Sequence, residues 1–334
     1  MSIVGGHTPL VGDSAPMRRL RALVQVAATS HLPVLVQGAT GTGKELVASA
    51  LHRGSGRRGP LVAFNVCAIG DTMFEDALFG HVRGAFTGAH ADVPGYLREA
   101  HGGTAFLDEI GSLPLGMQAK LLRAVETGVF RPVGAARDAS SDFRLVTATN
   151  ERLDALVAEG RFRSDLAHRL GAFVVQLPSL EDRLEDVPSL VQHFLRVLHP
   201  EELVVVDSAA LRLLQQRAWP GNVRELRYVV EVAAAFAGGA FTLDAVRFAL
   251  SQRESCGRVA RYDDGLQERT SLVEALERAR WDIDVAAHRL GVHRATLYRR
   301  MKRLGVERRG ARGAMTDTML ECLDGGMARE AGVA

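Results

Sequence analysis

The chain has 334 residues, of which 47% are hydrophobic and 24% are charged, and its formal net charge is +2. This length suggests about two or three domains, and the near-neutral charge excludes a uniformly basic nucleic-acid-binding molecule, so any basic surface must be local. The three cysteines are far apart and predict neither a disulfide framework nor a metal-ligand cluster. The chain contains no uninterrupted run of about 18 apolar residues, so no membrane span is predicted. We therefore expect a cytoplasmic protein.

A glycine-rich loop lies between an expected strand and an expected helix. Residues 17–29 have helical periodicity, residues 32–37 are an apolar run typical of a buried strand, and helical periodicity returns at 46–51. The loop consists of Gly38, Ala39, Thr40, Gly41, Thr42, Gly43, Lys44 and Glu45. Backbone N–H groups of such a loop face an anion, and Lys44 reaches the outer phosphates. Glu45 stands where a serine or threonine usually helps to hold magnesium, and the alternative interpretation is a glycine-rich turn without a ligand.

An acidic pair follows the second expected strand, residues 102–107. Asp108 is placed to hold Mg²⁺, and Glu109 is placed to polarise an attacking water, which phosphoryl transfer requires. Such a pair alone is more often a solvated strand end. Together with the phosphate loop, it predicts hydrolysis of a nucleotide.

A third expected strand, residues 143–149, ends in Asn150, whose amide can contact the γ-phosphate or the water. Alternation of strands and helices to this point predicts an α/β fold with a parallel sheet covered on both faces and the ligand at the carboxyl ends of the strands. Arg163 and Arg169 follow, on roughly opposite sides of an ideal helix. They are either surface residues or include an arginine finger, which can be supplied in trans and would make the active site a subunit interface.

Beyond residue 176 the pattern becomes mostly helical. A turn at Trp219-Pro220-Gly221-Asn222 precedes the last of three expected helices, which cover residues 187–198, 208–218 and 221–237. Arg224, early in that last helix, can reach back to a bound nucleotide and sense its state. A small helical lid on an α/β nucleotide-binding core is the AAA+ arrangement.

The carboxyl-terminal part predicts a helix-turn-helix after a polar linker that starts at residue 251. Expected helices cover 272–279, 283–290 and 294–304, with Gly291 in the turn. The last helix is basic and suits the major groove; its candidate DNA contacts are His293, Arg294, Thr296, Arg299, Arg300 and Arg303. The alternative is a small helical bundle with a solvated basic face.

One hexapeptide is unlike an ordinary turn: Gly84, Ala85, Phe86, Thr87, Gly88 and Ala89. Glycine tolerates backbone angles closed to other residues, so the two glycines describe a bendable tip around Phe86. The phenylalanine either anchors the turn in the core or is held out for a partner.

These motifs together resemble the bacterial enhancer-binding proteins, the AAA+ activators of sigma-54 RNA polymerase. The Gly-Thr-Gly-Lys-Glu form of the phosphate loop is typical of that family, so Glu45 fits it. Specific further matches are residues 78–89, 106–110, 148–150, 162–170 and 219–226, and residues 269–306 are similar to a Fis-type helix-turn-helix.

The resemblance implies a ring, commonly a hexamer, in which Arg163 and Arg169 complete the neighbour's ATP site and ATP is bound with Mg²⁺. Asn65 matches the asparagine that links the catalytic glutamate to the state of the nucleotide. The hexapeptide contacts sigma-54, hydrolysis remodels the closed promoter complex into an open one, and the helix-turn-helix holds the ring at enhancer DNA. The ring contains this chain alone or also a similar co-activator subunit.

We expect the following division of the chain: a short tail at 1–9, an α/β nucleotide-binding subdomain at 10–175, a helical lid at 176–250, a linker at 251–268, the helix-turn-helix at 269–306 and a disordered tail at 307–334. The family usually carries an amino-terminal receiver or ligand-sensing domain, whereas about ten residues precede the AAA+ region here. We therefore expect control by a separate regulatory protein, a partner subunit or abundance.

Two local departures lie between the hexapeptide and the acidic pair. Leu97-Arg98-Glu99 stands where the family more often has Phe-Glu-Arg, and Asp92 and Pro94 lie where basic residues are common. Both can alter coupling of hydrolysis to loop movement, but neither touches the phosphates, so we expect ATPase activity to survive.

Two alternative functions stay open. The first is a regulator of a sigma-70 promoter that uses the AAA+ core as a nucleotide-gated oligomerisation switch; an intact hexapeptide disfavours it. The second is a DNA-translocating motor, whose pore loops would carry lysine or arginine to track phosphate, whereas residues 85–87 carry neither.

Overall fold

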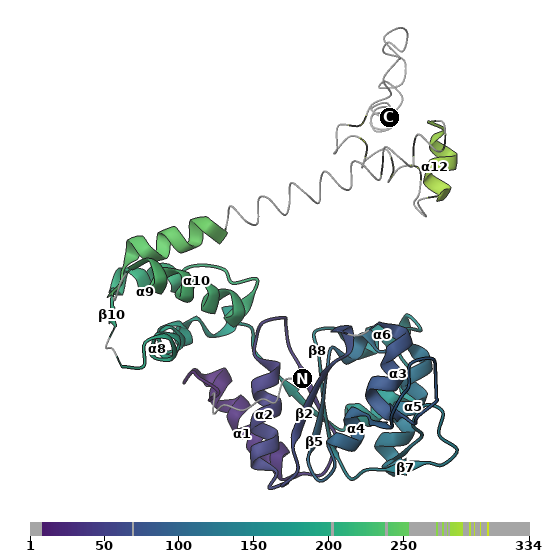
Figure 1. Cartoon of the computed structure of the whole chain (residues 1–334). Coiled ribbons are helices and arrows are strands. Elements are labelled where there is room, and N and C mark those ends of the chain that lie inside the picture. The colour runs from purple at the N-terminus through teal and green to yellow at the C-terminus, as the bar shows by residue number, and fades with distance from the viewer. Residues whose placement is uncertain are drawn as a thin grey trace, which may run out of the picture. The chain divides into compact units, whose positions relative to one another are not determined.

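The computed structural model describes residues 9–253 apart from 69, 202–203 and 238–239, together with residues 272, 276, 279, 281–289, 294, 297, 301 and 306. The chain divides into two compact units, Met1–Ser251 and Gln252–Ala334 (Figure 1). The first unit contains an α/β core followed by a helical lid.

A five-stranded sheet in the order β2-β5-β8-β1-β9 forms the centre of the first unit. Its strands are β1 (Val34–Gln37), β2 (Leu61–Asn65), β5 (Thr104–Asp108), β8 (Arg144–Thr149) and β9 (Phe173–Gln176). All neighbouring strands pair in parallel, which confirms the predicted parallel sheet. The three strands expected from apolar runs are β1, β5 and β8, which occupy the interior of the sheet, where both faces are buried. The sequence did not predict β2 and β9, which form the two edges.

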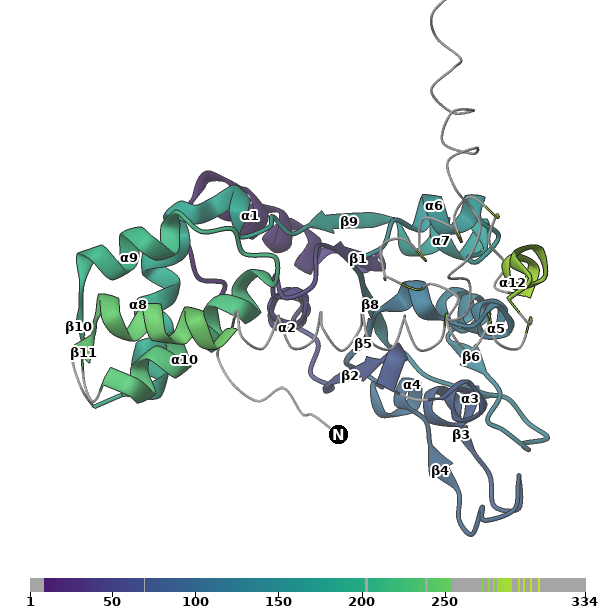
Figure 2. The ribbon, with the colours of Figure 1, turned by 90° about the horizontal axis from the view of Figure 1, so that it is seen from above.

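Helices cover both faces of this sheet (Figure 2). On one face, α1 (Ala15–Thr29) and α2 (Lys44–Gly54) pack on alternate strand residues, among them Val34, Val36 and Phe106. On the other face, Leu35, Leu107 and Leu145 belong to a second core cluster. That cluster includes residues from α3 (Asp71–Phe79), α4 (Tyr96–Glu99), α5 (Leu115–Thr127), α6 (Leu153–Ala158) and α7 (Ser164–Leu170). The alternation follows from the two-residue period of a strand.

Short 3₁₀ turns follow two of the strands: η1 (Val66–Ala68) comes after β2, and η2 (Ile110–Ser112) comes after β5. Two antiparallel hairpins lie outside the main sheet. The first pairs β3 (Gly80–His81) with β4 (Val93–Pro94), and the second pairs β6 (Val129–Phe130) with β7 (Ala139–Ser140). Hydrogen bonds from Val133 N to Gly80 O (2.8 Å) and from Val82 N to Val133 O (3.1 Å) join the two hairpins. The hexapeptide lies in the loop of the first hairpin.

The lid is mostly helical, as expected. Its elements are η3 (Glu181–Asp186), α8 (Val187–Leu198), α9 (Ser208–Gln215), α10 (Asn222–Ala237) and a small parallel pair, β10 (Val205–Val206) with β11 (Ala240–Phe241). Residues 243–253 form a further helix. Trp219, only 1% exposed, donates its indole N–H to Leu214 O at 2.9 Å and fills the centre of the lid core.

In the second unit, the described residues include α12 (Ile283–Arg289), which coincides with the expected helix at 283–290. Ala287 and Leu297 are buried in a small cluster, as a helix-turn-helix requires. Of the candidate DNA contacts, Arg294 is described and is exposed in a helix. His293, Thr296, Arg299, Arg300 and Arg303 lie outside the described residues, as does the tail at 307–334. Within the described part of the chain, no helix combines the length and the apolar character needed to cross a membrane.

Candidate functional site

The glycine-rich loop passes from β1 directly into the first turn of α2. Gly41 and Gly43 have φ values of 80° and 104°, in the region that favours glycine. Gly41 also lies close to the lid, because a Cβ there would come within 2.3 Å of Gly221 O. Lys44, the first residue of α2, is 7% exposed and donates to Gly38 O at 3.1 Å. The loop and the helix N-terminus therefore form a cradle for an anion.

The acidic pair lies next to this cradle. Lys44 Nζ is 3.7 Å from Glu109 Oε1, so the lysine of the loop and the expected water-activating carboxylate face the same space. Glu109 has a left-handed backbone (φ 55°), which a glutamate adopts at a cost of about 1–2 kcal/mol. Its N–H donates to Asp108 Oδ1 at 3.0 Å. Backbone strain at an acidic residue beside an anion cradle is typical of a functional position.

Asn150 and Asn65 border the same edge of the sheet. Asn150 follows β8 and donates its amide to Thr40 Oγ1 in the loop at 3.3 Å. Asn65 ends β2 and pairs in register with Asp108. Its side-chain oxygen accepts the N–H of Cys67 at 2.8 Å. The structure thus brings Lys44, Glu109 and Asn150 around the loop and places Asn65 beside the acidic pair.

The donor chemistry at this edge fits magnesium. Asp108 offers a half-buried carboxylate at the end of β5. Within the described residues, no cluster of three or more His, Cys, Asp or Glu side chains forms a protein-only metal cage. Mg²⁺ commonly binds through one or two carboxylates, with phosphate oxygens and waters completing its shell. A single carboxylate beside an anion cradle satisfies that pattern.

The lid contacts the phosphate loop through the start of α10. Asn222 is 4% exposed and has φ 52°; its amide donates to Thr40 O at 3.0 Å and its oxygen accepts the N–H of Leu180 at 2.8 Å. Arg224 donates its backbone N–H to Gly41 O at 3.2 Å, and its side chain is exposed. Arg224 thus meets the loop through its backbone, and its expected role in sensing a bound nucleotide stays a prediction. The pattern around Asn222 predicts only a turn, and the two contacts by which Asn222 bridges the lid and the loop were not predicted.

A mainly apolar cavity lies between α1, the loop and the lid, lined by residues that include Val11, Leu177, Phe194 and Val223. Arg183 also lines it and donates to Thr42 O at 3.4 Å. Burial lowers the pKa of Arg183, and the nearby Asp186 and Asp182 act in the opposite direction. Its buried Nε has no hydrogen-bond partner among the described residues.

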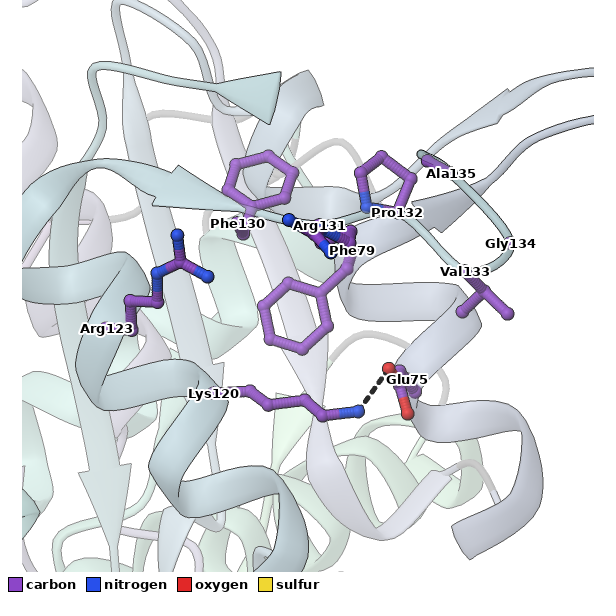
Figure 3. Close-up of a pocket in the computed structure, with 10 residues that line it drawn as sticks. All are labelled: Glu75, Phe79, Lys120, Arg123, Phe130, Arg131, Pro132, Val133, Gly134 and Ala135. Atoms are coloured by element: carbon purple, nitrogen blue, oxygen red, sulfur yellow. Dashed lines mark hydrogen bonds and ion pairs between the residues drawn. The ribbon is translucent and has the colours of Figure 1, made fainter. Parts of the chain in front are cut away.

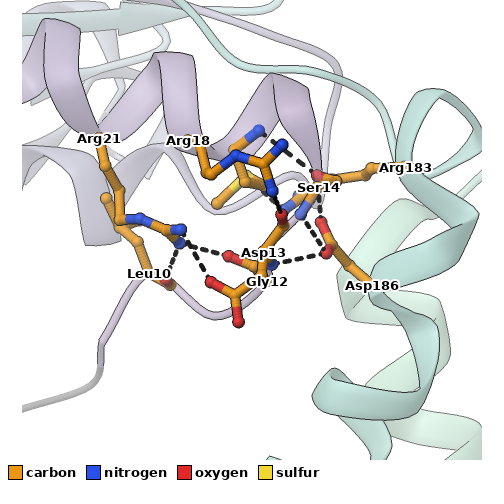
Figure 4. Close-up of polar contacts among 9 residues, drawn as sticks. Leu10, Gly12, Asp13, Ser14, Arg18, Arg21, Arg183 and Asp186 are labelled. Atoms are coloured by element: carbon orange, nitrogen blue, oxygen red, sulfur yellow. Dashed lines mark hydrogen bonds and ion pairs between the residues drawn. The ribbon is translucent and has the colours of Figure 1, made fainter.

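Asp186 joins the lid to the N-terminus of α1 (Figure 4). Its carboxylate accepts the N–H groups of Asp13 and Ser14 at 2.8 and 2.9 Å and the hydroxyl of Ser14 at 2.6 Å. Gly12 is required beside it, because a Cβ on Gly12 would lie 2.5 Å from the carboxylate. The segment before α1 is therefore fixed against the lid. No local pattern predicts this contact, because its partners are more than 170 residues apart.

Arg163 and Arg169 lie at the two ends of α7 and are both exposed. Arg163 precedes the helix and forms a bidentate pair with Asp165, with Nη2–Oδ2 and Nε–Oδ1 distances of 2.7 and 3.1 Å. The hydrogen bond from Arg163 lowers the pKa of Asp165. Within the described protomer, neither guanidinium has a hydrogen bond or ion pair with the phosphate loop. Both are free of the protomer's own site and accessible to another molecule.

The hexapeptide forms a compact loop whose tip faces solvent. Gly84 and Gly88 adopt φ values of 81° and 103°, as expected for a bendable tip. Phe86 is 46% exposed, and its ring packs edge-on against His81 with centroids 4.9 Å apart. Gly84 N donates to Ala89 O at 2.9 Å and closes the loop. The phenylalanine is thus held out from the core and does not anchor the turn inside it.

Asp92 has a specific place in this loop. Its carboxylate accepts the N–H of Arg83 at 2.7 Å, which connects the ascending and descending arms. Gly134 of the second hairpin supports the loop from the side, because a Cβ on Gly134 would lie 2.6 Å from Ala85 Cβ. A pocket of about 360 Å³ is lined by residues of this second hairpin, among them Phe130, and by Phe79 (Figure 3).

Three family models match successive parts of the chain. Residues 10–176 match the sigma-54 interaction domain, residues 181–260 match an AAA+ ATPase lid domain, and residues 266–304 match the Fis family of bacterial regulatory proteins.

Curated relatives are transcription regulators. The transcriptional regulator VasH of Vibrio cholerae is 46% identical over 244 residues, which are 72% of this chain and 46% of VasH. The regulator NtrC of Escherichia coli K12 is 38% identical over 343 residues, which cover 91% of this chain and 71% of NtrC. The chain spans about half the length of some relatives, VasH and NtrC of Rhizobium meliloti among them, at 46% each.

The chain is also similar to solved structures of a related protein, NtrX. NtrX of Brucella abortus in complex with ATP is 34% identical and has a TM-score of 0.64, covering 90% of this chain and 70% of NtrX. The complex of NtrX with ADP has a TM-score of 0.65 at 33% identity and covers 91% of this chain and 70% of NtrX. The described geometry and these matches agree on an AAA+ core, a lid and a Fis-type DNA-binding module. The chain belongs to the family of NtrC-like, sigma-54-dependent transcription activators.

Proposed function

We propose that the chain binds ATP with Mg²⁺, hydrolyses it in a ring, and uses the hydrolysis to remodel the closed complex of sigma-54 RNA polymerase with a promoter into an open one. The observation that carries this proposal is the convergence of Lys44, Glu109 and Asn150 on one phosphate loop, in the same unit as a solvent-facing hexapeptide. NtrX, which binds ATP and ADP in its crystal structures, supports the choice of nucleotide.

The roles in hydrolysis follow from position. Lys44 and the N–H groups of the loop bind the outer phosphates, and Asp108 would hold Mg²⁺, which neutralises charge on them. Glu109 orients and polarises the attacking water. In the described state Glu109 pairs with Lys44 at 3.7 Å, so arrival of the γ-phosphate would draw the lysine away and release the carboxylate for water. Asn150 would sense the γ-phosphate, which its hydrogen bond to Thr40 in the loop supports.

Arg163 and Arg169 would complete the site of a neighbouring subunit. Their exposure and the lack of contact with their own protomer's loop support a role in trans. The Arg163–Asp165 pair is exposed, and such pairs contribute only about 0–1 kcal/mol, so exchanging Asp165 for a phosphate carries little cost. The expected ring is a hexamer, of this chain alone or with a similar subunit.

The hexapeptide would be the contact to sigma-54. Phe86 and Thr87 are exposed at its tip, and the two glycines with positive φ allow it to rise or fold back. Movement of the hairpins with the state of the nucleotide would then act on the polymerase. The Fis-type module would hold the ring at enhancer DNA, with Arg294 and its neighbours contacting bases or phosphates.

Replacement of Thr87 tests the output of this machine. We expect Thr87→Ala to retain ATPase activity and to lose open complexes at a sigma-54 promoter, because the loop is remote from the phosphates. Thr29→Ala, a change at an exposed threonine outside the loop, is the matched control and should retain both ATPase activity and promoter opening. Normal promoter opening by Thr87→Ala would show that Thr87 is not needed for the proposed contact of the hexapeptide with sigma-54.

A further inference from the structure

One fully buried polar side chain connects two parts of the proposed ATP machinery. Gln118 lies in the second turn of α5 and is 0% exposed. Its amide nitrogen donates to Leu113 O at 2.8 Å and to Arg161 O at 3.0 Å, and its oxygen accepts the backbone N–H of Arg163 at 2.7 Å. Two carbonyls on one side and one N–H on the other fix the orientation of the amide. The side chain uses both of its donors.

The contacts of Gln118 hold the segment that presents Arg163. They reach the residues on both sides of Phe162, which is 3% exposed and belongs to the core. The N–H groups of Arg161 and Phe162 in turn donate to Leu156 O at 2.9 and 3.1 Å. The backbone of residues 161–163 is therefore fixed from two directions, while the guanidinium of Arg163 remains exposed.

The hydrogen bond from Gln118 to Leu113 O connects it to the segment that follows the acidic pair of the same subunit. Leu113 follows η2, which begins directly after Glu109, and η2 is closed by a hydrogen bond from Ser112 N to Glu109 O at 3.0 Å. Gln118 is thus bonded at one end to the segment that carries Glu109 and at the other to the segment that carries Arg163. One amide spans the subunit's own site and the arginine that it offers to the next.

We propose that Gln118 is a positioning residue that sets the backbone of Arg163 for action on a neighbouring subunit's ATP. This inference rests on the proposed role of Arg163 in trans. Gln118 touches neither nucleotide nor metal in this scheme and acts only through the residues that it holds. Because two of its three hydrogen bonds hold residues 161 and 163, its main effect should appear in the site of the adjacent subunit.

The primary variant is Gln118→Leu, which preserves size and helix propensity and removes all three hydrogen bonds. Misplacement of a catalytic group by about 1 Å can reduce the rate on the order of 10²-fold, and we expect a fall of that size in kcat for ATP. Nucleotide affinity should stay close to wild type, because the phosphate loop is untouched. Glu126→Leu on the exposed face of α5 is the matched control and should retain wild-type turnover.

Mixed rings separate positioning from general damage. Rings of Gln118→Leu alone have intact phosphate loops and misplaced fingers, and rings of Lys44→Ala alone have intact fingers and no bound nucleotide. In a mixture, ATP bound to the first subunit faces an undisturbed Arg163 from the second. We expect the mixture to regain ATPase activity at least ten-fold above either parent. Inactive mixtures, with normal nucleotide binding by Gln118→Leu, would overturn the inference.

A parallel mixture of Arg163→Ala with Lys44→Ala tests the underlying function separately. If that pair regains activity while the Gln118→Leu pair does not, Arg163 acts in trans and the role of Gln118 is wrong. If the Arg163→Ala pair also stays inactive, the trans assignment of Arg163 is wrong and the inference falls with it.

Gln118→Glu gives a second test that does not require the fold to accept leucine at position 118. Its carboxylate still accepts from Arg163 N but has no proton for Leu113 O or Arg161 O, whereas the protonated acid restores one donor. Burial raises the pKa of a carboxyl group, so the acid form is accessible near neutral pH. We expect the kcat of this variant, relative to wild type, to rise as the pH is lowered. A pH profile parallel to that of wild type would count against the positioning role.

Discussion

Asn222 gives the sharpest test of how the lid is coupled to the phosphate loop. The substitution Asn222→Gly removes the hydrogen bonds to Thr40 O and Leu180 N and keeps a backbone that accepts φ 52° without strain. Asn222→Ala removes the same bonds and adds the cost of a left-handed alanine, about 1–2 kcal/mol. The two variants therefore separate the hydrogen bonds from the backbone conformation.

The expected magnitude follows from the two hydrogen bonds. Each contributes about 0.5–1.5 kcal/mol net, so Asn222→Gly should weaken contact between lid and loop by about 1–3 kcal/mol. If closure of the lid accompanies nucleotide binding, the same free energy appears in the affinity for ATP. At about 1.4 kcal/mol for each factor of ten, the Kd should rise about 5- to 150-fold.

Titration with a fluorescent ATP analogue measures this change directly. Arg227→Ala, on the exposed side of the same helix, is the control, because its ion pair with Glu231 is exposed and should matter little. Asn222→Gly binding ATP as tightly as Arg227→Ala, with normal thermal stability, would refute the coupling of the lid to the loop through Asn222.

Three further predictions concern the site, the lid junction and pH. Lys44→Ala should abolish ATP binding in the fluorescence titration, whereas Glu109→Gln should bind ATP and lose hydrolysis; steady turnover by Glu109→Gln would contradict its role with water. Asp186→Ala should lower the free energy of unfolding in urea by at least about 2 kcal/mol, because a buried carboxylate with three hydrogen bonds is lost, and Asp182→Ala, at an exposed position, should have a much smaller effect. Burial, and to a lesser extent nearby arginines, lowers the pKa of His52 in the folded chain below 6.5. As the pH falls, His52 is therefore protonated in the unfolded chain before it is protonated in the folded chain. The free energy of unfolding should then decrease as the pH drops below about 6.5. His52→Gln should flatten that fall in thermal unfolding curves, and an unchanged slope would assign the effect to other groups.

Local patterns predicted the parts of the site that follow directly from single strands. Lys44 ends the loop that follows β1, Asp108 ends β5 and Asn150 follows β8, and parallel strands bring their carboxyl ends to one edge. Strand β9 is as short as β1 but leads into no recognisable motif, so its four residues alone did not predict it. The hairpin strands have two residues each, too few for any periodicity.

Contacts between distant segments were beyond the reach of such patterns. Asn222 and Thr40 are 182 residues apart, and Gln118 and Arg163 are 45 apart. A glutamine within an amphipathic helix is indistinguishable in sequence from one that faces solvent, yet Gln118 is fully buried. The same holds for Arg183, because the cavity that it lines is formed by three separate segments of the chain. These residues become candidates only when the packing is known.

The central claim is that ATP hydrolysis by this chain opens a sigma-54 promoter. Permanganate reactivity of unpaired thymines reports that opening directly, in a reaction containing the chain, sigma-54 RNA polymerase, promoter DNA and either ATP, ADP or no nucleotide. We expect reactive thymines around the start site only when the nucleotide is ATP, and none with ADP or with Glu109→Gln. Equal reactivity without nucleotide, or opening with sigma-70 polymerase in place of the sigma-54 enzyme, would contradict it.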